Sequence, residues 1–487
     1  MRTRLHARYV LGHHEGDHVI HRDASVVYED DRIVHVGPSY DGQVDESIDL
    51  GNSFIVPGLI DLDAVADLDH IILDCWGDPE LRKGHQWSED YFTNRRQDVF
   101  TQEERRLIRK FAMAELILHG VTTAMPIASE VHSSWAETYQ DFVDMSEEAL
   151  ELGLRVYLGP SYRGGVHVTR QDGTPDVMWS AAEGEEGLDG ARRFAEHAAG
   201  LPDLIQPVFA PCRIETMTRE LLEKTHELAT ALDVRVRLHC MQSMRELQLI
   251  DAAHGMTPMD LLEEIGMMNE RLLVPHAKYM SLESAGRPTD DELRRFASSG
   301  ASVVHTPLTE ARLGYVIDSF DRYVDAGVPM AFGSDCFPPD LIRGMELSSN
   351  LAKIMESSFD AGSPADLLRS ATTGGADALG RPDLGRLQPG AQADLTVFSF
   401  DHPAVGLIED PVRTLLMHAT ARDVTMTVVA GRTVMRDGVI PGLDLDALRR
   451  EAQELFDRMK SRYPERDVHG RDVDTLFPPT FPSAPLS

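Results

Sequence analysis

Six acidic or imidazole side chains fall at or near the carboxyl ends of predicted strands. They are Asp61, Asp63, His239, His276, His305 and Asp335. If those strands run parallel around a common axis, the six groups meet at one mouth. Histidine and carboxylate ligands suit Zn²⁺, Fe²⁺ or a similar ion, which lowers the pKa of bound water to near neutrality. The residue types predict a metal-dependent hydrolase, although any one of them alone could be a core or loop residue.

The elements that would position these groups alternate between helices and strands over residues 57–387. Thr101 and Glu104 have capping-box spacing and open an amphipathic helix that ends at Gly120. A buried strand follows at 121–127, and the same order of helix, turn and strand recurs along the chain. The series predicts a (β/α)8 barrel of the TIM type. The alternative, an open doubly wound sheet, would carry a GxGxxG turn that this sequence lacks.

Both ends of the chain have a different pattern from the middle. Residues 1–56 and 388–440 read as short strands separated by Gly, Asp and Pro. We expect the two segments to pair into one small composite β-sandwich beside the 57–387 barrel. Residues 441–487 are predicted to form an amphipathic helix followed by an extended, proline-rich tail.

Composition excludes several classes of partner. The chain has 47 basic and 80 acidic residues and a formal charge of -33, which repels nucleic acid and anionic membranes. Its 4 cysteines form no CxxC pair, and no apolar signal or membrane-spanning run is present. These features predict a cytoplasmic protein whose partner is a small-molecule substrate.

Several segments together resemble one known family. They include PGLID at 57–61, GVTTA at 120–124, HGMTPMDLLEEIG at 254–266, LLVPHAKYMS at 272–281, AGVPMAFGSD at 326–335 and GRLQPGAQADLTVF at 385–398. In order and spacing they are similar to the amidohydrolase superfamily, in its cytosine-deaminase-like and triazine hydrolase (chlorohydrolase) branch. That branch includes guanine, 8-oxoguanine and S-adenosylhomocysteine deaminases. The resemblance implies a (β/α)8 barrel with a β-sandwich from both termini, and a homo-oligomer, dimer or tetramer.

The resemblance also implies roles for three retained residues. His239 matches the metal ligand of the fifth barrel strand, and Asp335 matches the aspartate of the eighth strand. His276 matches the sixth-strand histidine that contacts water or substrate. Asp335 is the expected general base and His276 the expected acid or electrophilic partner.

Three other positions depart from the family pattern. Asp63 and Val65 stand where the first strand normally carries an HxH metal motif, and Gln242 replaces the glutamate of the fifth-strand HxxE pattern. Valine cannot bind a metal, whereas Asp63 could donate an oxygen together with His239 and Asp335. More oxygen ligands favour iron, manganese or magnesium over zinc. An amide cannot transfer protons, so Gln242 is expected to orient the substrate.

Further side chains are expected to contact the substrate. Trp76 and Trp87 lie after the first barrel strand, where the family places a lid, and could stack on a heterocycle. Arg163 could bind a carboxylate. His305 and Arg312 lie at and after the seventh strand and could face the pocket. Packing in the core or on the surface is the alternative for each.

Three interpretations of function remain open. The first is a hydrolase, deaminase-like or chlorohydrolase-like, that breaks a C–N or comparable C–X bond of a small nitrogen heterocycle or cyclic amide. It would use one divalent ion, Fe, Zn or Mn, in an atypical site. The second is a metal-free enzyme on the same scaffold, with no cofactor. The third is a non-catalytic binding or assembly protein that kept the barrel for its shape.

Overall fold

The structure is a computed structural model that describes residues 1–69, 71–72, 81, 85–127, 135 and 137–482. Trp76, assigned above to a substrate lid, lies outside the described residues. In the described part of the chain, no helix is both long and apolar enough to cross a membrane.

Eight parallel strands form the central barrel. In spatial order they are β6 (Leu59–Val65), β8 (Val121–Ile127), β9 (Arg155–Leu158), β13 (Ile205–Pro211), β14 (Arg235–Arg237), β15 (Leu272–Pro275), β16 (Ser302–His305) and β17 (Met330–Phe332). Each strand pairs with the next in parallel register. The predicted (β/α)8 fold is therefore confirmed.

The barrel closes between its first and last strands, β6 and β17, which pack side by side. Just beyond β17, the backbone N–H of Asp335 donates to the carbonyl of Asp63, with an N–O distance of 2.8 Å. Ser334 donates from its N–H and its hydroxyl to the Asp61 carboxylate, at 3.0 and 2.6 Å. These bonds fix Asp63 and Asp335 beside each other at the mouth.

Helices cover the outside of the barrel because each has an apolar face to bury. Thr101 and Glu104 form the predicted capping box of the first barrel helix. The main outer helices are α2 (Gln102–Leu118), α3 (Tyr139–Leu152), α4 (Ala181–Ala198), α5 (Arg219–Leu232), α6 (Met244–His254), α7 (Pro258–Glu264), α8 (Asp290–Ser299), α10 (Phe320–Asp325) and α11 (Leu341–Glu356). Short helices α9 (Pro307–Arg312), α12 (Pro364–Arg369), α13 (Gly375–Ala378) and α14 (Pro411–Met417) complete the shell.

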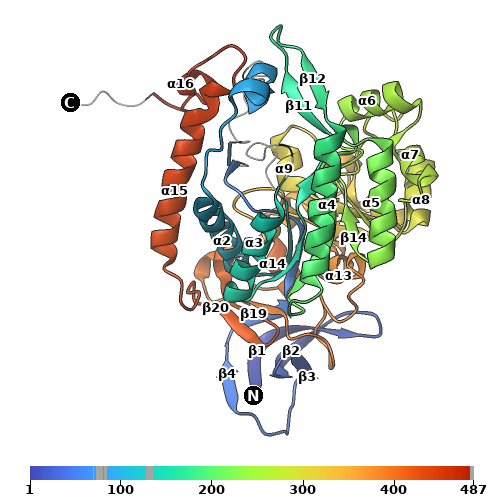
Figure 1. The fold of residues 1–487 in the computed structure, drawn as a ribbon. Coiled ribbons are helices and arrows are strands. Elements are labelled where there is room, and N and C mark those ends of the chain that lie inside the picture. The colour runs from blue at the N-terminus through green and yellow to red at the C-terminus, as the bar shows by residue number, and fades with distance from the viewer. Residues whose placement is uncertain (70, 73–80, 82–84, 128–134, 136, 483–487) are drawn as a thin grey trace.

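A second sheet is built from both chain ends, as predicted, and lies at one end of the barrel (Figure 1). Its strands are β1 (Arg2–His14), β2 (Asp17–Glu29), β3 (Arg32–Gly37), β4 (Glu46–Asp49), β5 (Ser53–Pro57), β18 (Leu395–Ser399), β19 (Val424–Val429) and β20 (Arg432–Arg436). The antiparallel pair β5 and β18 joins the N-terminal strands to the C-terminal ones.

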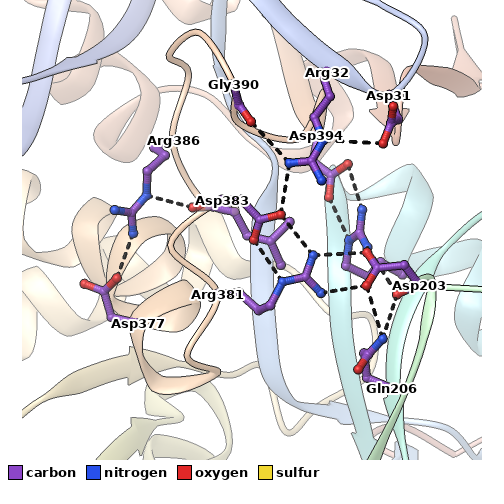
Figure 2. Close-up of polar contacts among 12 residues, drawn as sticks. Asp31, Arg32, Asp203, Gln206, Asp377, Arg381, Asp383, Arg386, Gly390 and Asp394 are labelled. Atoms are coloured by element: carbon purple, nitrogen blue, oxygen red, sulfur yellow. Dashed lines mark hydrogen bonds and ion pairs between the residues drawn. The ribbon is translucent and has the colours of Figure 1, made fainter. Parts of the chain in front are cut away.

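Arginine and aspartate side chains connect this sheet to the amino ends of the barrel strands. Figure 2 shows Arg381 bound to both Asp203 and Asp383, with Arg32 of β3 also on Asp383. Deeper in the interface, the guanidinium of Arg155 donates to Asp394 from Nε at 3.0 Å. This network lies at the barrel end opposite the strand carboxyl ends.

A small three-stranded sheet lies at the other end of the barrel. It contains β7 (Trp87–Ser88), β11 (Gly165–Thr169) and β12 (Pro175–Trp179), and the β11–β12 hairpin projects from the molecule in Figure 1. The C-terminal helix α15 (Leu445–Arg462) packs against α2, and Arg466 beyond it lies 4.2 Å from the Trp87 ring. A short helix, α16 (Val473–Leu476), follows. The chain after α15 therefore packs against the segment that contains β7.

Candidate active site

Four of the predicted residues meet at the carboxyl ends of the barrel strands. Asp63 lies on β6, His239 just after β14, His276 just after β15 and Asp335 after β17. The backbone φ angles of His276 and Asp335 are 71° and 42°. Residues other than glycine rarely adopt such positive values. The backbone turns sharply at these two positions and directs their side chains toward the mouth.

The distances define a compact group. Nε2 of His239 lies 3.7 Å from Oδ2 of Asp63, and Nε2 of His276 lies 3.9 Å from Oδ2 of Asp335. The ligand atoms of Asp63, His239 and His276 all lie within 4.8 Å of one another. The sequence suggested Asp335 as the third metal ligand beside Asp63 and His239. In the structure His276 completes the closest group of three, and Asp335 lies next to His276.

Asp63 is completely buried and carries the negative charge of the trio. Neither of its carboxylate oxygens has a hydrogen-bond partner among the described residues. Burial alone would raise the pKa of this carboxyl, but His239 and the guanidinium of Arg237 lower it below its ordinary value. A buried carboxylate without a hydrogen-bond donor, facing two imidazoles, fits a metal ion in donor type and spacing.

Each imidazole is oriented by a second contact on its other nitrogen. Nδ1 of His239 lies 3.2 Å from the Cys212 carbonyl, to which it donates, so Nε2 is the nitrogen that faces Asp63. Nδ1 of His276 lies 2.8 Å from the Thr306 hydroxyl and 3.5 Å from Oε1 of Glu310. Burial lowers the pKa of His276, but Glu310 and Asp335 more than compensate and leave it raised.

Gln242 is held at the rim of the mouth by a polar side chain and a backbone contact. Arg213 donates from Nη1 to the amide oxygen of Gln242. The Gln242 backbone N–H donates to Glu246 of α6 at 2.9 Å. Because its amide oxygen already accepts from a cation, the side chain has a fixed orientation suited to presenting its NH₂ group.

The predicted substrate contacts are placed less uniformly. Trp87 is stacked on Tyr91 with ring centroids 5.5 Å apart, and Arg163 donates from Nε to the Trp135 carbonyl at 2.9 Å. Both tryptophans and Tyr91 belong to one buried aromatic cluster. These side chains therefore have packing partners of their own.

The two predicted contacts near the seventh strand also differ from each other. Nε2 of His305 lies 2.9 Å from the Ser348 hydroxyl, and burial lowers the pKa of His305 to about 4. This histidine is neutral and packed between Phe320 and Phe332. Arg312 ends α9 and is half-buried.

Three site residues were missed at the level of sequence. Arg237 precedes His239 by two positions and so shares its face of the strand, a period-2 signal that was available in VRVRLHC. Arg213 follows β13 by two residues, another position at a strand end. Glu310, behind His276, had no comparable signal, because it lies on α9 and reaches the site only through the tertiary fold.

Comparison with known proteins agrees with this geometry. A 5-methylthioadenosine/S-adenosylhomocysteine deaminase of Halobacterium salinarum is 27% identical over 471 residues, covering 95% of this chain and 97% of the relative. An 8-oxoguanine deaminase of Pseudomonas aeruginosa is 30% identical, covering 72% of this chain and 75% of the relative. The relatives named as deaminases support the predicted hydrolase class.

Solved structures show the same fold. An adenosine deaminase from Xanthomonas campestris with bound zinc has a TM-score of 0.75 at 21% identity, covering 94% of this chain and 98% of its own. An atrazine chlorohydrolase from Arthrobacter aurescens complexed with zinc has a TM-score of 0.75 at 21% identity, covering 93% and 100%. The Amidohydrolase family pattern matches residues 54–434. With barrel, terminal sheet and strand-end histidines all in their expected order, the chain belongs to the amidohydrolase family.

Proposed function

We propose that the protein hydrolyses a C–N or comparable C–X bond of a small nitrogen heterocycle, in the manner of a deaminase or chlorohydrolase. The observation that carries this proposal is the grouping of Asp63, His239, His276 and Asp335 at one mouth, with contacts of 3.7 and 3.9 Å. Such a set of carboxylates and imidazoles can activate water and protonate a leaving group.

The roles follow from position and charge. Asp335 is the general base, since its carboxylate faces the mouth beside His276. When no metal is bound, His276, with its raised pKa, is the acid that protonates the heterocycle or the leaving group; as a metal ligand it would be neutral and would not fill this role. Gln242, held by Arg213, donates hydrogen bonds that orient the substrate.

Asp63, His239 and His276 are the residues that would hold a divalent cation, Fe, Zn or Mn. When bound, such an ion would polarise the substrate and lower the pKa of water near it. With Val65 unable to contribute, the site offers three donors in its closest group, so binding is expected to be weaker than in a four-ligand site.

We further propose that the protein acts in the cytoplasm on a small molecule and assembles as a homo-oligomer, a dimer or tetramer. The acidic charge of -33 and the lack of CxxC pairs support the first part. The family resemblance supports the second.

The test is turnover of a panel of purines, pyrimidines, triazines and lactams, with ammonia and chloride release both measured. Asp335→Asn and His276→Asn should each lower kcat/KM roughly 100-fold or more. Glu409→Gln, a surface carboxylate paired with Arg413, is the control and should keep full activity. An inactive wild-type protein, with or without added metal, would favour a non-catalytic relative, and an Asp335→Asn variant with normal rates would overturn the assigned base.

A further inference from the structure

A buried arginine lies within the candidate site and has no counterpart in the roles assigned so far. Arg237 is the last residue of β14, and its side chain is 4% exposed. Its Nη1 donates to the Met125 carbonyl on β8 at 3.0 Å and lies 3.7 Å from Oδ1 of Asp63 on β6. The positively charged side chain of Arg237 therefore crosses the barrel interior from β14 and reaches β6 and β8 on the opposite side.

The environment of this guanidinium makes Asp63 its main counter-charge. A buried arginine is costly unless it is paired and hydrogen-bonded. Its Nε is buried without a hydrogen-bond partner in the described part of the chain. Among the described residues, Asp63 is the acidic side chain that lies within ion-pair distance of it, at 3.7 Å.

Arg237 and His239 each lie near a different oxygen of the Asp63 carboxylate. The guanidinium faces Oδ1 at 3.7 Å, and the imidazole faces Oδ2 at 3.7 Å. A divalent cation held by Oδ2, His239 and His276 would share that carboxylate with the guanidinium. Because like charges repel strongly at short range inside a protein, the two cations compete for Asp63.

We propose that Arg237 is the resident cation of the site, supplying from a side chain the positive charge beside Asp63 and weakening the binding of a metal ion there. Arg237 acts through the Asp63 carboxylate, which lies 3.7 Å from its Nη1, and is thus a positioning residue. This inference refines the site of the proposed function and rests on its location at the same mouth.

The experiment measures Zn²⁺ binding to the metal-stripped, full-length protein by equilibrium dialysis and elemental analysis. Arg237→Met removes the charge at similar side-chain length and should tighten Zn²⁺ binding roughly tenfold or more. Arg237→Lys keeps the charge and should bind Zn²⁺ about as weakly as the wild type. A loss of packing alone would not increase metal affinity, so a gain separates the proposed role from a structural one.

Two further variants locate the effect. Arg235→Met removes one positive charge from the same strand, where Arg235 contacts the Glu270 carbonyl, and should change Zn²⁺ affinity by less than about twofold. Asp63→Asn in the Arg237→Met background should abolish the gain. A folded Arg237→Met variant that binds Zn²⁺ no more tightly than the wild type would overturn the proposal.

The wild-type protein supplies an independent measurement should Arg237→Met fail to fold. Purified after growth with added zinc and passed through gel filtration, it should retain less than about 0.2 equivalents of metal. About one equivalent that survives this treatment would overturn the proposal. None of these readouts needs a substrate. The protein can therefore be inactive on the substrate panel while the role of Arg237 is confirmed, or active while the role of Arg237 is refuted.

Discussion

Glu310 and Asp335 lie on opposite sides of the His276 ring. Oε1 of Glu310 is 3.5 Å from Nδ1, and Oδ2 of Asp335 is 3.9 Å from Nε2. Burial disfavours the imidazolium, but the two carboxylates favour it and raise the pKa of His276 overall. The ring can thus keep a proton at a higher pH than an ordinary histidine, as an acid at this position requires.

Glu310→Gln tests this arrangement through the pH dependence of kcat. An acid must be protonated to act, so activity is lost as pH rises through the pKa of His276. Removing the Glu310 charge lowers that pKa, and the alkaline limb of the profile should move to lower pH. At the wild-type optimum we expect kcat to fall roughly tenfold with little change in KM.

Thr306→Val is the matched control for that variant. Thr306 contacts the same nitrogen of His276 at 2.8 Å but carries no charge. Its loss should therefore move the alkaline limb less than Glu310→Gln does. An alkaline limb that stays in place in Glu310→Gln would show that His276 is not the group that titrates.

Gln242→Glu tests the consequence of the missing acidic residue. The new carboxylate would pair with Arg213 in place of the present amide bond and could transfer a proton. We expect the ratio of ammonia release to chloride release to rise roughly tenfold on paired amino- and chloro-substituted heterocycles, because only the amine leaves as a protonated group. Gln242→Leu, which cannot hydrogen-bond, should slow both reactions, and an unchanged ratio in Gln242→Glu would exclude a proton-transfer role at this position.

The strands and their terminal residues could be predicted because both depend on local patterns. Alternation of helix and strand indicated the barrel, and the rule that barrel chemistry lies at strand carboxyl ends selected His239, His276 and Asp335. Contacts across the barrel could not be predicted. The approach of Arg237 to Asp63 depends on the diameter of the barrel and on rotamers. The stacking of Trp87 on Tyr91 depends on how the C-terminal segment packs over them.

The buried carboxyl of Asp61 is expected to make the stability of the fold depend on pH. Burial raises the pKa of Asp61 to about 7, although the hydrogen bonds from Ser334 act to lower it. A raised folded-state pKa stabilises the fold below the unfolded pKa, and this contribution is lost as pH rises through about 7. Asp61→Asn is neutral at every pH, so its free energy of unfolding relative to the wild type should increase by about 2 kcal/mol between about pH 5 and 8.

Urea unfolding of both proteins at the two pH values measures this difference. Other buried groups that titrate in the same pH range, including Glu137, are present in both proteins. Their contributions to the free energy of unfolding therefore cancel in the comparison. A difference in free energy that does not change with pH would mean that Asp61 stays ionised in the folded protein.

The buried pair Arg155–Asp394 is expected to hold the terminal sheet on the barrel. The side chains of Arg155 and Asp394 are 1% and 2% exposed, and Asp394 also accepts from the Ala430 N–H at 2.6 Å. Asp394→Asn leaves the buried Arg155 guanidinium paired with the more exposed Asp203 as its one acidic partner among the described residues, and should lower the free energy of unfolding by about 3 kcal/mol.

An exposed pair provides the comparison for Asp394→Asn. Arg413 and Glu409 are 60% and 79% exposed, so Glu409→Gln should cost less than about 0.5 kcal/mol. Because Arg155 lies at the amino end of its strand, away from His276 and Asp335, kcat per folded molecule should stay unchanged in Asp394→Asn. Equal losses of stability in the two variants would show that burial does not strengthen the Arg155–Asp394 contact, and that the sheet is held by its apolar face alone.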